Sequence, residues 1–455
     1  MRQHLADRSL WELAKTYACA YLEEINDRAV FPKPEALEGL RIFEEPLAEG
    51  PGNPVQILRW LHEFGSPATV AQTGGRYFGF VNGGVIPAAL AAKWLSDVWD
   101  QNCALYVMSP LASQLEAVCE RWLVDLLGLP AGAAAGLVSG TSAATLCGLA
   151  AGRNELLRRL RWDVHAQGVF GAPRLRVVLG EQAHSSVFKA LSLLGLGEAD
   201  LVRAPVDTQG RLAADRMPPL DERTLVVAQA GNVNSGAFDP FEEICERAGR
   251  AGAWVHIDGA FGLWCAASNR RRSLTRGLDR ADSWSVDAHK TLNAPYDCGI
   301  VLCKNRETLR AAMRAQAAYL QYSENRDGMV YTLDMSRRAR AVELWAALKY
   351  LGRSGVAELV DGSGDLAERF AEKLQAQGFQ VRNEVVFNQV LVSGETPEET
   401  TATLKNIQES GECWCGGAVW NNEPVIRISV CSWATTAQDV DRSVAAFVKA
   451  REKAR

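Results

Sequence analysis

The sequence lacks both a long apolar run and a strongly charged segment. No stretch approaches the roughly 18 consecutive apolar residues that a membrane-spanning helix needs, and residues 1–28 carry charges throughout, unlike a secretory segment. The formal net charge is only −5. No stripe of arginine and lysine alternates with aromatic residues, which argues against a nucleic-acid partner. We therefore expect a soluble protein without a membrane or a nucleic acid as its partner.

Disulfide and metal-binding patterns are also missing. The eleven cysteines are scattered through apolar stretches, which is typical of reduced, buried thiols in a cytoplasmic protein. Cys413 and Cys415 are separated by one residue and have no second pair, so they do not form a zinc-binding pattern. These absences predict a cytoplasmic protein without a metal site.

At 455 residues the chain is too long for a single hydrophobic core. Residues 1–60 start with helical spacing of apolar residues and then contain several prolines, which is typical of an arm that docks onto another surface. Residues 61–325 are expected to form a large α/β domain. Residues 326–455 are expected to form a smaller C-terminal α+β domain, preceded by a polar, glycine-containing loop that suits a mobile lid.

Short apolar strands alternate with helical patterns between residues 174 and 305. The predicted strands are 175–179, 225–228, 255–257, 284–286 and 300–302. This alternation predicts a mostly parallel sheet covered on both faces, and such sheets bind ligands beyond the carboxyl ends of their strands. The residues that follow predicted strand ends include Gly140, His184, Asn232, Asp258 and Lys290.

Two of these residues suit a cofactor that has an aldehyde and a pyridine ring. Lys290 follows the strand at 284–286, where burial favours the neutral amine, the form that attacks a carbonyl. Asp258 follows the strand at 255–257, and a carboxylate there can keep a pyridine nitrogen protonated. The alternative roles are a surface salt bridge for Lys290 and a helix N-cap for Asp258.

A phosphate site is indicated at Gly140, Thr141 and Ser142. Small residues with accessible N–H groups and two hydroxyls at a helix start are typical of a phosphate cradle. The Gly-Lys-Ser/Thr of a nucleotide-binding loop is absent, and a simple N-cap would also explain the hydroxyls. Upstream, the glycine-rich stretch 74–84 suits either a backbone that approaches a ligand or another surface closely, or a flexible loop.

Several motifs occur together between about residues 73 and 435. They are Ser139-Gly-Thr-Ser142, Glu181-Gln-Ala-His-Ser-Ser186, Asn234-Ser-Gly-Ala-Phe-Asp-Pro240, His256-Ile-Asp-Gly-Ala260, Asp287-Ala-His-Lys290 with Asp297-Cys-Gly299, Arg337-Arg-Ala-Arg-Ala-Val-Glu-Leu-Trp345, and Arg427-Ile-Ser-Val-Cys-Ser-Trp433. In this combination the chain resembles the group II pyridoxal-phosphate-dependent amino-acid decarboxylases, which include the aromatic-amino-acid, histidine and glutamate decarboxylases.

The resemblance implies an α/β protein of the fold-type-I class of pyridoxal-phosphate enzymes. It implies a homodimer with pyridoxal 5′-phosphate (PLP) at the subunit interface, and decarboxylation of an L-amino acid to the amine and CO₂. Lys290 would carry the cofactor as a Schiff base, Asp258 would pair with its ring nitrogen, and His184 would stack on the ring. The other cofactor-binding residues that it implies are Gly140, Thr141, Ser142, Asn232 (where many relatives have threonine), Ala260, Asp287 and His289.

The proton donor is the point on which the expected product depends. In the family a loop tyrosine, contributed across the dimer, is thought to protonate the substrate carbon after CO₂ leaves, and its replacement is associated with oxidative deamination to an aldehyde. Tyr331 is the first candidate for this tyrosine and Tyr322 the second. An aldehyde synthase is therefore the alternative function, while an aminotransferase or a cofactor-binding scaffold without turnover is further from the motif pattern.

The substrate is indicated only by the residues near the expected pocket. We name Phe80, Tyr106 and Arg338 as candidate substrate-binding residues. The aromatic side chains favour an aromatic or other apolar substrate, although aromatic residues also build ordinary cores. Arg76 could instead serve an acidic substrate.

Overall fold

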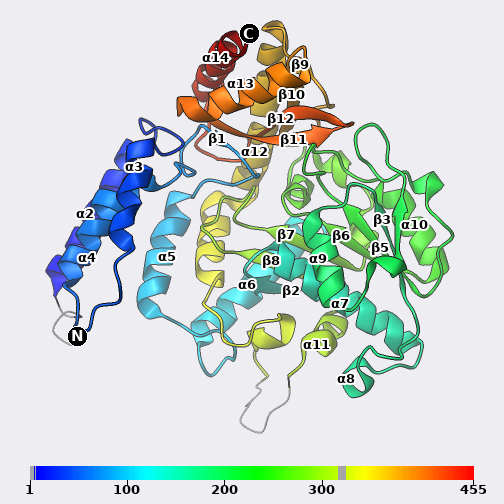
Figure 1. Cartoon of the computed structure of the whole chain (residues 1–455). Helices are drawn as coiled ribbons and strands as arrows, with labels where there is room; N and C mark the ends of the chain where they lie inside the picture. Colours follow the sequence, from blue (N-terminus) through cyan, green and yellow to red (C-terminus); the bar gives the residue numbers. More distant parts are fainter. Residues whose placement is uncertain (1–4, 6, 316–323) are drawn as a thin grey trace. The chain divides into compact units, whose positions relative to one another are not determined.

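The computed structural model describes residue 5 and residues 7–315 and 324–455, which form two compact units (Figure 1). The central unit comprises Gly83–Glu368 and Arg382–Leu391, and the C-terminal unit comprises the residues up to Asn82, Arg369–Val381 and Val392–Arg455. The boundaries expected at residues 60 and 325 are thus not those of the two units. The N-terminal arm shares a unit with the end of the chain, and residues 326–368 belong to the central unit.

Within its described residues, the central unit contains a sheet of seven strands. The five strands predicted from the alternating pattern are among them. In spatial order the strands are β2 (Ala134–Val138), β8 (Gly299–Cys303), β7 (Ser283–Asp287), β6 (Trp254–Asp258), β5 (Thr224–Gln229), β3 (Arg176–Gly180) and β4 (Leu201–Ala204). Strand β8 runs antiparallel to both of its neighbours, and the pairs from β7 to β4 are parallel. The carboxyl ends of β2, β7, β6, β5 and β3 therefore meet at one edge.

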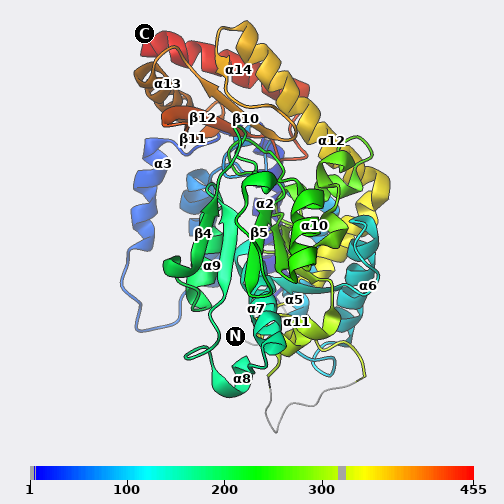
Figure 2. The same cartoon turned by 90° about the vertical axis from the view of Figure 1, so that its right-hand side faces the viewer.

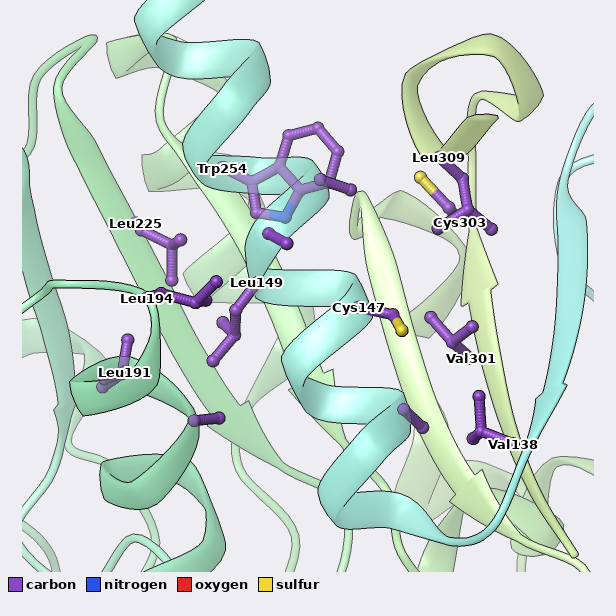
Figure 3. Close-up of a cluster of buried hydrophobic side chains, with 14 of the residues drawn as sticks. Val138, Cys147, Leu149, Leu191, Leu194, Leu225, Trp254, Val301, Cys303 and Leu309 are labelled. Carbon is purple, nitrogen blue, oxygen red and sulfur yellow. The ribbon is translucent and has the colours of Figure 1, made fainter. Parts of the chain in front are cut away.

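The central unit also contains α-helices. They are α5 (Pro87–Trp99), α6 (Pro110–Leu126), α7 (Thr141–Arg159), α8 (Val164–Gln167), α9 (Ser185–Leu193), α10 (Phe241–Ala251), α11 (Arg306–Met313) and α12 (Ala341–Ala376), the last of which continues into the C-terminal unit. Helix α7 contacts β2, β8, β7, β6 and β5 and so spans the middle of one face. Figure 3 shows its Cys147 and Leu149 lying among strand side chains such as Val301. Fully burying a leucine of this kind contributes about 1.5–3 kcal/mol.

The C-terminal unit contains the helices α2 (Arg8–Glu24), α3 (Pro34–Gly39), α4 (Pro54–Trp60), α13 (Pro397–Ser410) and α14 (Ala437–Ala454). Its sheet has the order β1 (Tyr77–Phe78), β11 (Trp414–Trp420), β12 (Glu423–Ser429), β10 (Gln389–Ser393) and β9 (Gln380–Val381). Helices α13 and α14 pack against each other, and α13 also packs against β11 and β12 (Figure 2). The short strand β1 reaches the sheet by parallel pairing with β11.

Two expectations of absence can be compared with the described part of the chain. None of its helices combines the length and apolarity that a membrane crossing requires, and its His, Cys, Asp and Glu side chains form no cluster that could hold a metal ion. All eleven cysteines are free thiols, and all but Cys19 are buried.

Candidate active site

The carboxyl ends of β6 and β7 bring two carboxylates to one edge of the central sheet. Asp258 is the last residue of β6, and Asp287 is the last residue of β7. Beyond these strands, Gly259 N–H donates to the carbonyl oxygen of Ser285 at 2.9 Å, and Asp287 N–H donates to that of Ala260 at 2.9 Å. These two bonds extend the strand pairing and fix the carboxylates in neighbouring positions.

Lys290 lies next to Asp287. Its Nζ is 3.3 Å from Asp287 Oδ2, and the lysine side chain is 20% exposed while that of the aspartate is 3% exposed. The lysine is thus half-withdrawn from water and paired with a buried carboxylate. Such a partner holds the amine in place at the end of β7.

Gly83, which belongs to the central unit, lies against the backbone of this lysine. A Cβ on Gly83 would collide with the carbonyl oxygen of Lys290, so this position requires a residue without a side chain. The adjacent Gly84 N–H donates to Asn293 Oδ1 at 2.6 Å. Of the two readings that the sequence allowed for residues 74–84, the close approach of backbone to another surface is the one found at Gly83.

The start of α7 meets Asp287 from the other side. Thr141 N–H donates to Asp287 Oδ1 at 2.6 Å, and the helix has neither a side-chain N-cap nor an acidic residue in its first turn. The hydroxyl oxygen of Thr141 is buried and has no hydrogen-bond partner among the described residues. A helix start without a side chain at its N-cap residue and with an unsatisfied hydroxyl suits an anion such as a phosphate, at the N–H groups that Asp287 does not bind.

His289 borders the same helix start. Its Nδ1 accepts the N–H of Cys298 at 3.1 Å, so the neutral ring carries its proton on Nε2, which lies 3.6 Å from Asp287 Oδ1. Burial lowers the pKa of His289, and the charge of Asp287 opposes this shift. A Cβ on Gly140 would lie 3.3 Å from Cε1 of His289. The imidazole N–H and the helix start thus flank one small space.

Asp258 and His184 form the other half of the cluster. Burial raises the pKa of the Asp258 carboxyl, and the nearby His184 and Lys290 oppose the rise. His184 is the N-cap residue of α9, and its ring is exposed. Its Nδ1 lies 2.7 Å from the hydroxyl of Ser186. A buried carboxylate with a raised pKa is suited to pair with a protonated ring nitrogen, which would restore its charged form.

Two predicted site residues are bonded to other groups of the protein. Asn232 is 1% exposed, and its Oδ1 accepts the N–H groups of Asn234 and Ser235 while its Nδ2 donates to Gln182 at 3.3 Å. The asparagine therefore builds the turn after β5, and this use of its amide does not support the predicted contact with the cofactor.

Arg338 is likewise already paired. Its guanidinium contacts Glu343 and, at 2.9 Å, Asp297 Oδ1. Arg340 pairs with the same aspartate at 3.1 Å. Because two carboxylates already share the charge of Arg338, this arginine is not an open site for a substrate carboxylate.

Tyr331 is not brought to Lys290. It is 6% exposed in the short helix Gly328–Tyr331, and its hydroxyl accepts a bond from Arg306 at 2.9 Å. Arg306 also binds Glu120, which in turn accepts the N–H of Ala135 at the start of β2. Lys290 of the same chain follows the opposite end of the neighbouring strands. The bond from Arg306 to the Tyr331 hydroxyl does not support the expected role of Tyr331 as a proton donor across the dimer.

The remaining predictions fall on other parts of the chain. Tyr322 lies outside the described residues. Phe80 belongs to the C-terminal unit, where it stacks on Trp414 with ring centroids 5.4 Å apart. Tyr106 is a half-buried residue of the central unit, and its N–H donates to Asp327 Oδ1 at 2.8 Å.

Two residues that shape the site were not among the predicted site residues, although Gly299 belongs to the Asp297-Cys-Gly299 motif. The ring of Tyr296 stacks on His289 with centroids 4.2 Å apart. Gly299 lies so close to Gly140 that a Cβ would come within 2.8 Å of three of its backbone atoms. Both follow Lys290 closely in the sequence, but only the folded chain shows which residues they touch.

Comparison with known proteins agrees with this geometry. Residues 70–393 match the model of the pyridoxal-dependent decarboxylase conserved domain. The match covers more than half of the chain, and the chain belongs to this family. It is therefore a PLP-dependent carboxy-lyase, and its cofactor is pyridoxal 5′-phosphate. The aromatic-L-amino-acid decarboxylase of Bacillus atrophaeus is 26% identical over 419 residues, which cover 87% of this chain and 85% of the relative.

Solved structures show the same fold. A structure of Oryza sativa TDC with PLP and tryptamine superimposes with a TM-score of 0.90 at 22% identity, covering 98% of this chain and 97% of that one. The 4-hydroxyphenylacetaldehyde synthase of Rhodiola rosea superimposes with a TM-score of 0.84 at 22% identity, covering 99% and 98%. At this level of identity the two structures establish the fold, which is the expected fold type I.

Proposed function

We propose that this enzyme removes the carboxylate of an L-amino acid to give the corresponding amine and CO₂. The observation that carries the proposal is the cluster of Lys290, Asp258 and the uncapped start of α7 at one sheet edge. These groups match an aldehyde, a ring nitrogen and a phosphate, respectively. When bound, PLP supplies the electron sink that stabilises the carbanion left by CO₂ loss.

Each residue of the cluster has a distinct task in this proposal. Lys290 binds the aldehyde carbon through its Nζ, and Asp258 holds a proton on the ring nitrogen. His184 stacks on the ring, and Ala260 packs on the opposite face. The phosphate is held by Gly140, Thr141, Ser142 and His289, and Asp287 orders this group by binding both Thr141 and Lys290.

The substrate that we propose has an aromatic or other apolar side chain. The two arginines considered for acidic groups are both neutralised inside the protein. Arg338 is paired as described above, and Arg76 is 4% exposed and pairs with Glu412 at 3.0 Å. A buried, paired arginine gains little from a second carboxylate and would leave its first partner unpaired. The central unit's partly exposed Tyr106 fits an apolar side chain.

We also propose a cytoplasmic homodimer with the active site at its subunit interface. Support comes from α5 and the segment that follows it in the central unit, where large apolar side chains face solvent. Val98 is 75% exposed, Leu95 55% and Val107 64%. Exposed apolar residues in this density are typical of a protein–protein interface, and a second copy of the chain would cover them.

The cytoplasmic location that we propose is supported by the cysteines, because ten buried free thiols suit a reducing compartment.

The second candidate function is oxidative deamination to an aldehyde. It is favoured by one observation, the engagement of the Tyr331 hydroxyl by Arg306, which leaves this tyrosine unsuited to protonate the substrate carbon. Without a protein acid at that carbon, molecular oxygen can take its electrons. The products would then be the aldehyde, CO₂, ammonia and hydrogen peroxide.

One assay separates the two functions. The protein is supplied with PLP and each of the twenty standard amino acids, and CO₂, amine, ammonia and peroxide are measured together. We expect CO₂ and amine in equal amounts with an aromatic or apolar substrate. Ammonia and peroxide in place of amine would establish the aldehyde reaction instead, and turnover of acidic amino acids alone would overturn the proposed substrate class.

The cofactor attachment and the dimer need separate tests. Borohydride reduction of the PLP-loaded protein, followed by peptide mapping, should find the cofactor on Lys290. A label on another lysine would refute the proposed placement.

Sedimentation equilibrium should give twice the chain mass of 49.6 kDa, and replacing Val98 and Leu95 with glutamate should give the monomer. A wild-type monomer would rule out the dimer.

A further inference from the structure

A polar seam runs beneath α7 from the interior of the central unit to the proposed site. Four residues of the helix, about one turn apart, each meet the polar side of β6 and β7. Cβ atoms on Gly152 and Gly148 would lie 2.8 Å from the indole of Trp254 and 2.7 Å from the ring of His256. Closer to the site, Thr145 Oγ1 bonds to Ser285 Oγ at 2.9 Å, and Thr141 N–H bonds to Asp287 at 2.6 Å.

His256 is the centre of this seam. It is completely buried, with Nδ1 2.8 Å from Ser283 Oγ and Nε2 3.3 Å from Ser285 Oγ. Trp254 Nε1–H donates to the same Ser283 hydroxyl at 3.0 Å. His256 and Asp258 are alternate residues of β6, so both side chains lie on the face that α7 covers.

The hydrogen bonds of the seam have one consistent direction. The indole N–H must donate to Ser283, so the Ser283 hydroxyl can donate to His256 Nδ1. The opposite nitrogen then carries the proton and donates to Ser285, whose hydroxyl donates to Thr145. Burial lowers the pKa of His256 from its ordinary value of 6.5 to about 3, which keeps the ring neutral. A neutral imidazole has one donor and one acceptor, and the hydrogen bonds of the seam use both.

Such a seam fixes the position of the helix along the sheet. The rest of the interface is apolar, as Figure 3 shows for Leu149, Leu225 and Val301, and apolar contacts alone tolerate sliding. A buried polar group without a partner costs about 1–3 kcal/mol. A shift of α7 by one turn would break every bond of the seam, so the seam selects one register.

We propose that His256 is a positioning residue for the cofactor. It is the spacer between sheet and helix that sets the uncapped start of α7 relative to Asp258. Under the proposed function, the phosphate binds at the start of α7 and the ring nitrogen binds at Asp258. The inference about His256 rests on that placement. The phosphate and the ring nitrogen belong to one rigid cofactor and must bind at the same time. A change in the distance between the start of α7 and Asp258 therefore weakens binding at both places.

The test compares the dissociation constant for PLP across a set of variants. His256→Phe fills the space but removes both nitrogens, and we expect its dissociation constant to rise at least about tenfold, the equivalent of 1.4 kcal/mol. Thr145→Val removes one hydroxyl and should give a smaller rise. His256→Asn keeps one donor and one acceptor and should recover part of the affinity. The matched control is Leu149→Val, a trim of the apolar side of the same helix.

A second readout uses the protein without cofactor. In His256→Phe, hydrogen exchange of the amides at 141–145 should become faster, while Leu149→Val should leave it unchanged at a similar loss of thermal stability. If His256→Phe and Thr145→Val bind PLP as tightly as the control, the inference is wrong. The borohydride mapping described above tests the placement itself, so the failure of one proposal is distinguishable from the failure of the other.

Discussion

Gly299→Ala is the substitution whose effect follows most directly from the geometry of the proposed phosphate site. Gly299 begins β8, and a Cβ there would lie within 2.8 Å of three backbone atoms of Gly140, the residue that precedes α7. Ordinary contacts begin at 3.4 Å, so the closest of these atoms, Gly140 Cα, must retreat by about 1 Å in a tightly packed interior. No flexible side chain is available to absorb the overlap.

Two consequences are expected, and they have different sizes. Overpacking of this kind costs about 1–3 kcal/mol of stability. The retreat of Gly140 also displaces the first turn of α7, and the loss of one charge-assisted hydrogen bond to the phosphate costs about 1.5–3 kcal/mol. The dissociation constant for PLP should therefore rise about 10- to 100-fold.

Equilibrium dialysis with PLP and thermal unfolding of the cofactor-free protein measure the two effects separately. Gly249→Ala is the matched control, because this helical glycine has nothing within 4 Å of the added Cβ. That control should be neutral or slightly stabilising, since alanine is favoured over glycine in helices by about 1 kcal/mol. Unchanged PLP affinity in a folded Gly299→Ala protein would refute the phosphate placement at the start of α7.

Three further predictions address other residues. Asp258→Asn should retain PLP but lower kcat at least about 10- to 100-fold, because a charged hydrogen bond to the ring nitrogen is worth about 1.5–3 kcal/mol; a normal rate would remove Asp258 from the mechanism. Tyr331→Phe should cost about 0.5–1.5 kcal/mol of stability, since it removes the acceptor of Arg306, and should leave the ratio of amine to aldehyde unchanged; a switch to aldehyde would restore Tyr331 as the proton donor. His256 has a folded pKa of about 3 against 6.5, so below pH 6.5 the unfolded chain binds the extra proton and stability falls towards pH 3. Relative to His256→Asn, the wild-type free energy of unfolding should drop by about 1.4 kcal/mol between pH 7.5 and 5.5 in urea titrations, and parallel profiles would contradict this account.

The sequence was sufficient for the features that depend on local pattern. The apolar stretches before Asp258 and Lys290 were predicted as strands, and the structure has β6 and β7 there. The helix after Gly140 and the mostly parallel sheet were confirmed in the same way. Strand and helix preferences, and the rule that ligands bind at the carboxyl ends of parallel strands, follow from short-range order along the chain.

The features that the sequence missed depend on partners far away in the chain. Arg338 was a candidate for the substrate until its pairing with Asp297, 41 residues earlier, was visible. Tyr331 was a candidate proton donor, but its hydroxyl serves Arg306. A charged or polar residue has the same local signature whether it faces a ligand or a buried partner. The distinction is made by the packing that brings its partner close.

The contrast between local sequence pattern and long-range packing separates what the sequence determined about this protein from what the tertiary structure determined. The sequence by itself determined the strand order along the chain, the lysine and the carboxylate at strand ends, and hence the cofactor class. Only the tertiary structure showed that His256 bonds to Ser283 and Ser285 beneath α7, and that the start of this helix bonds to Asp287. A local pattern can specify a backbone conformation, whereas a spacing between two elements exists only after their side chains pack.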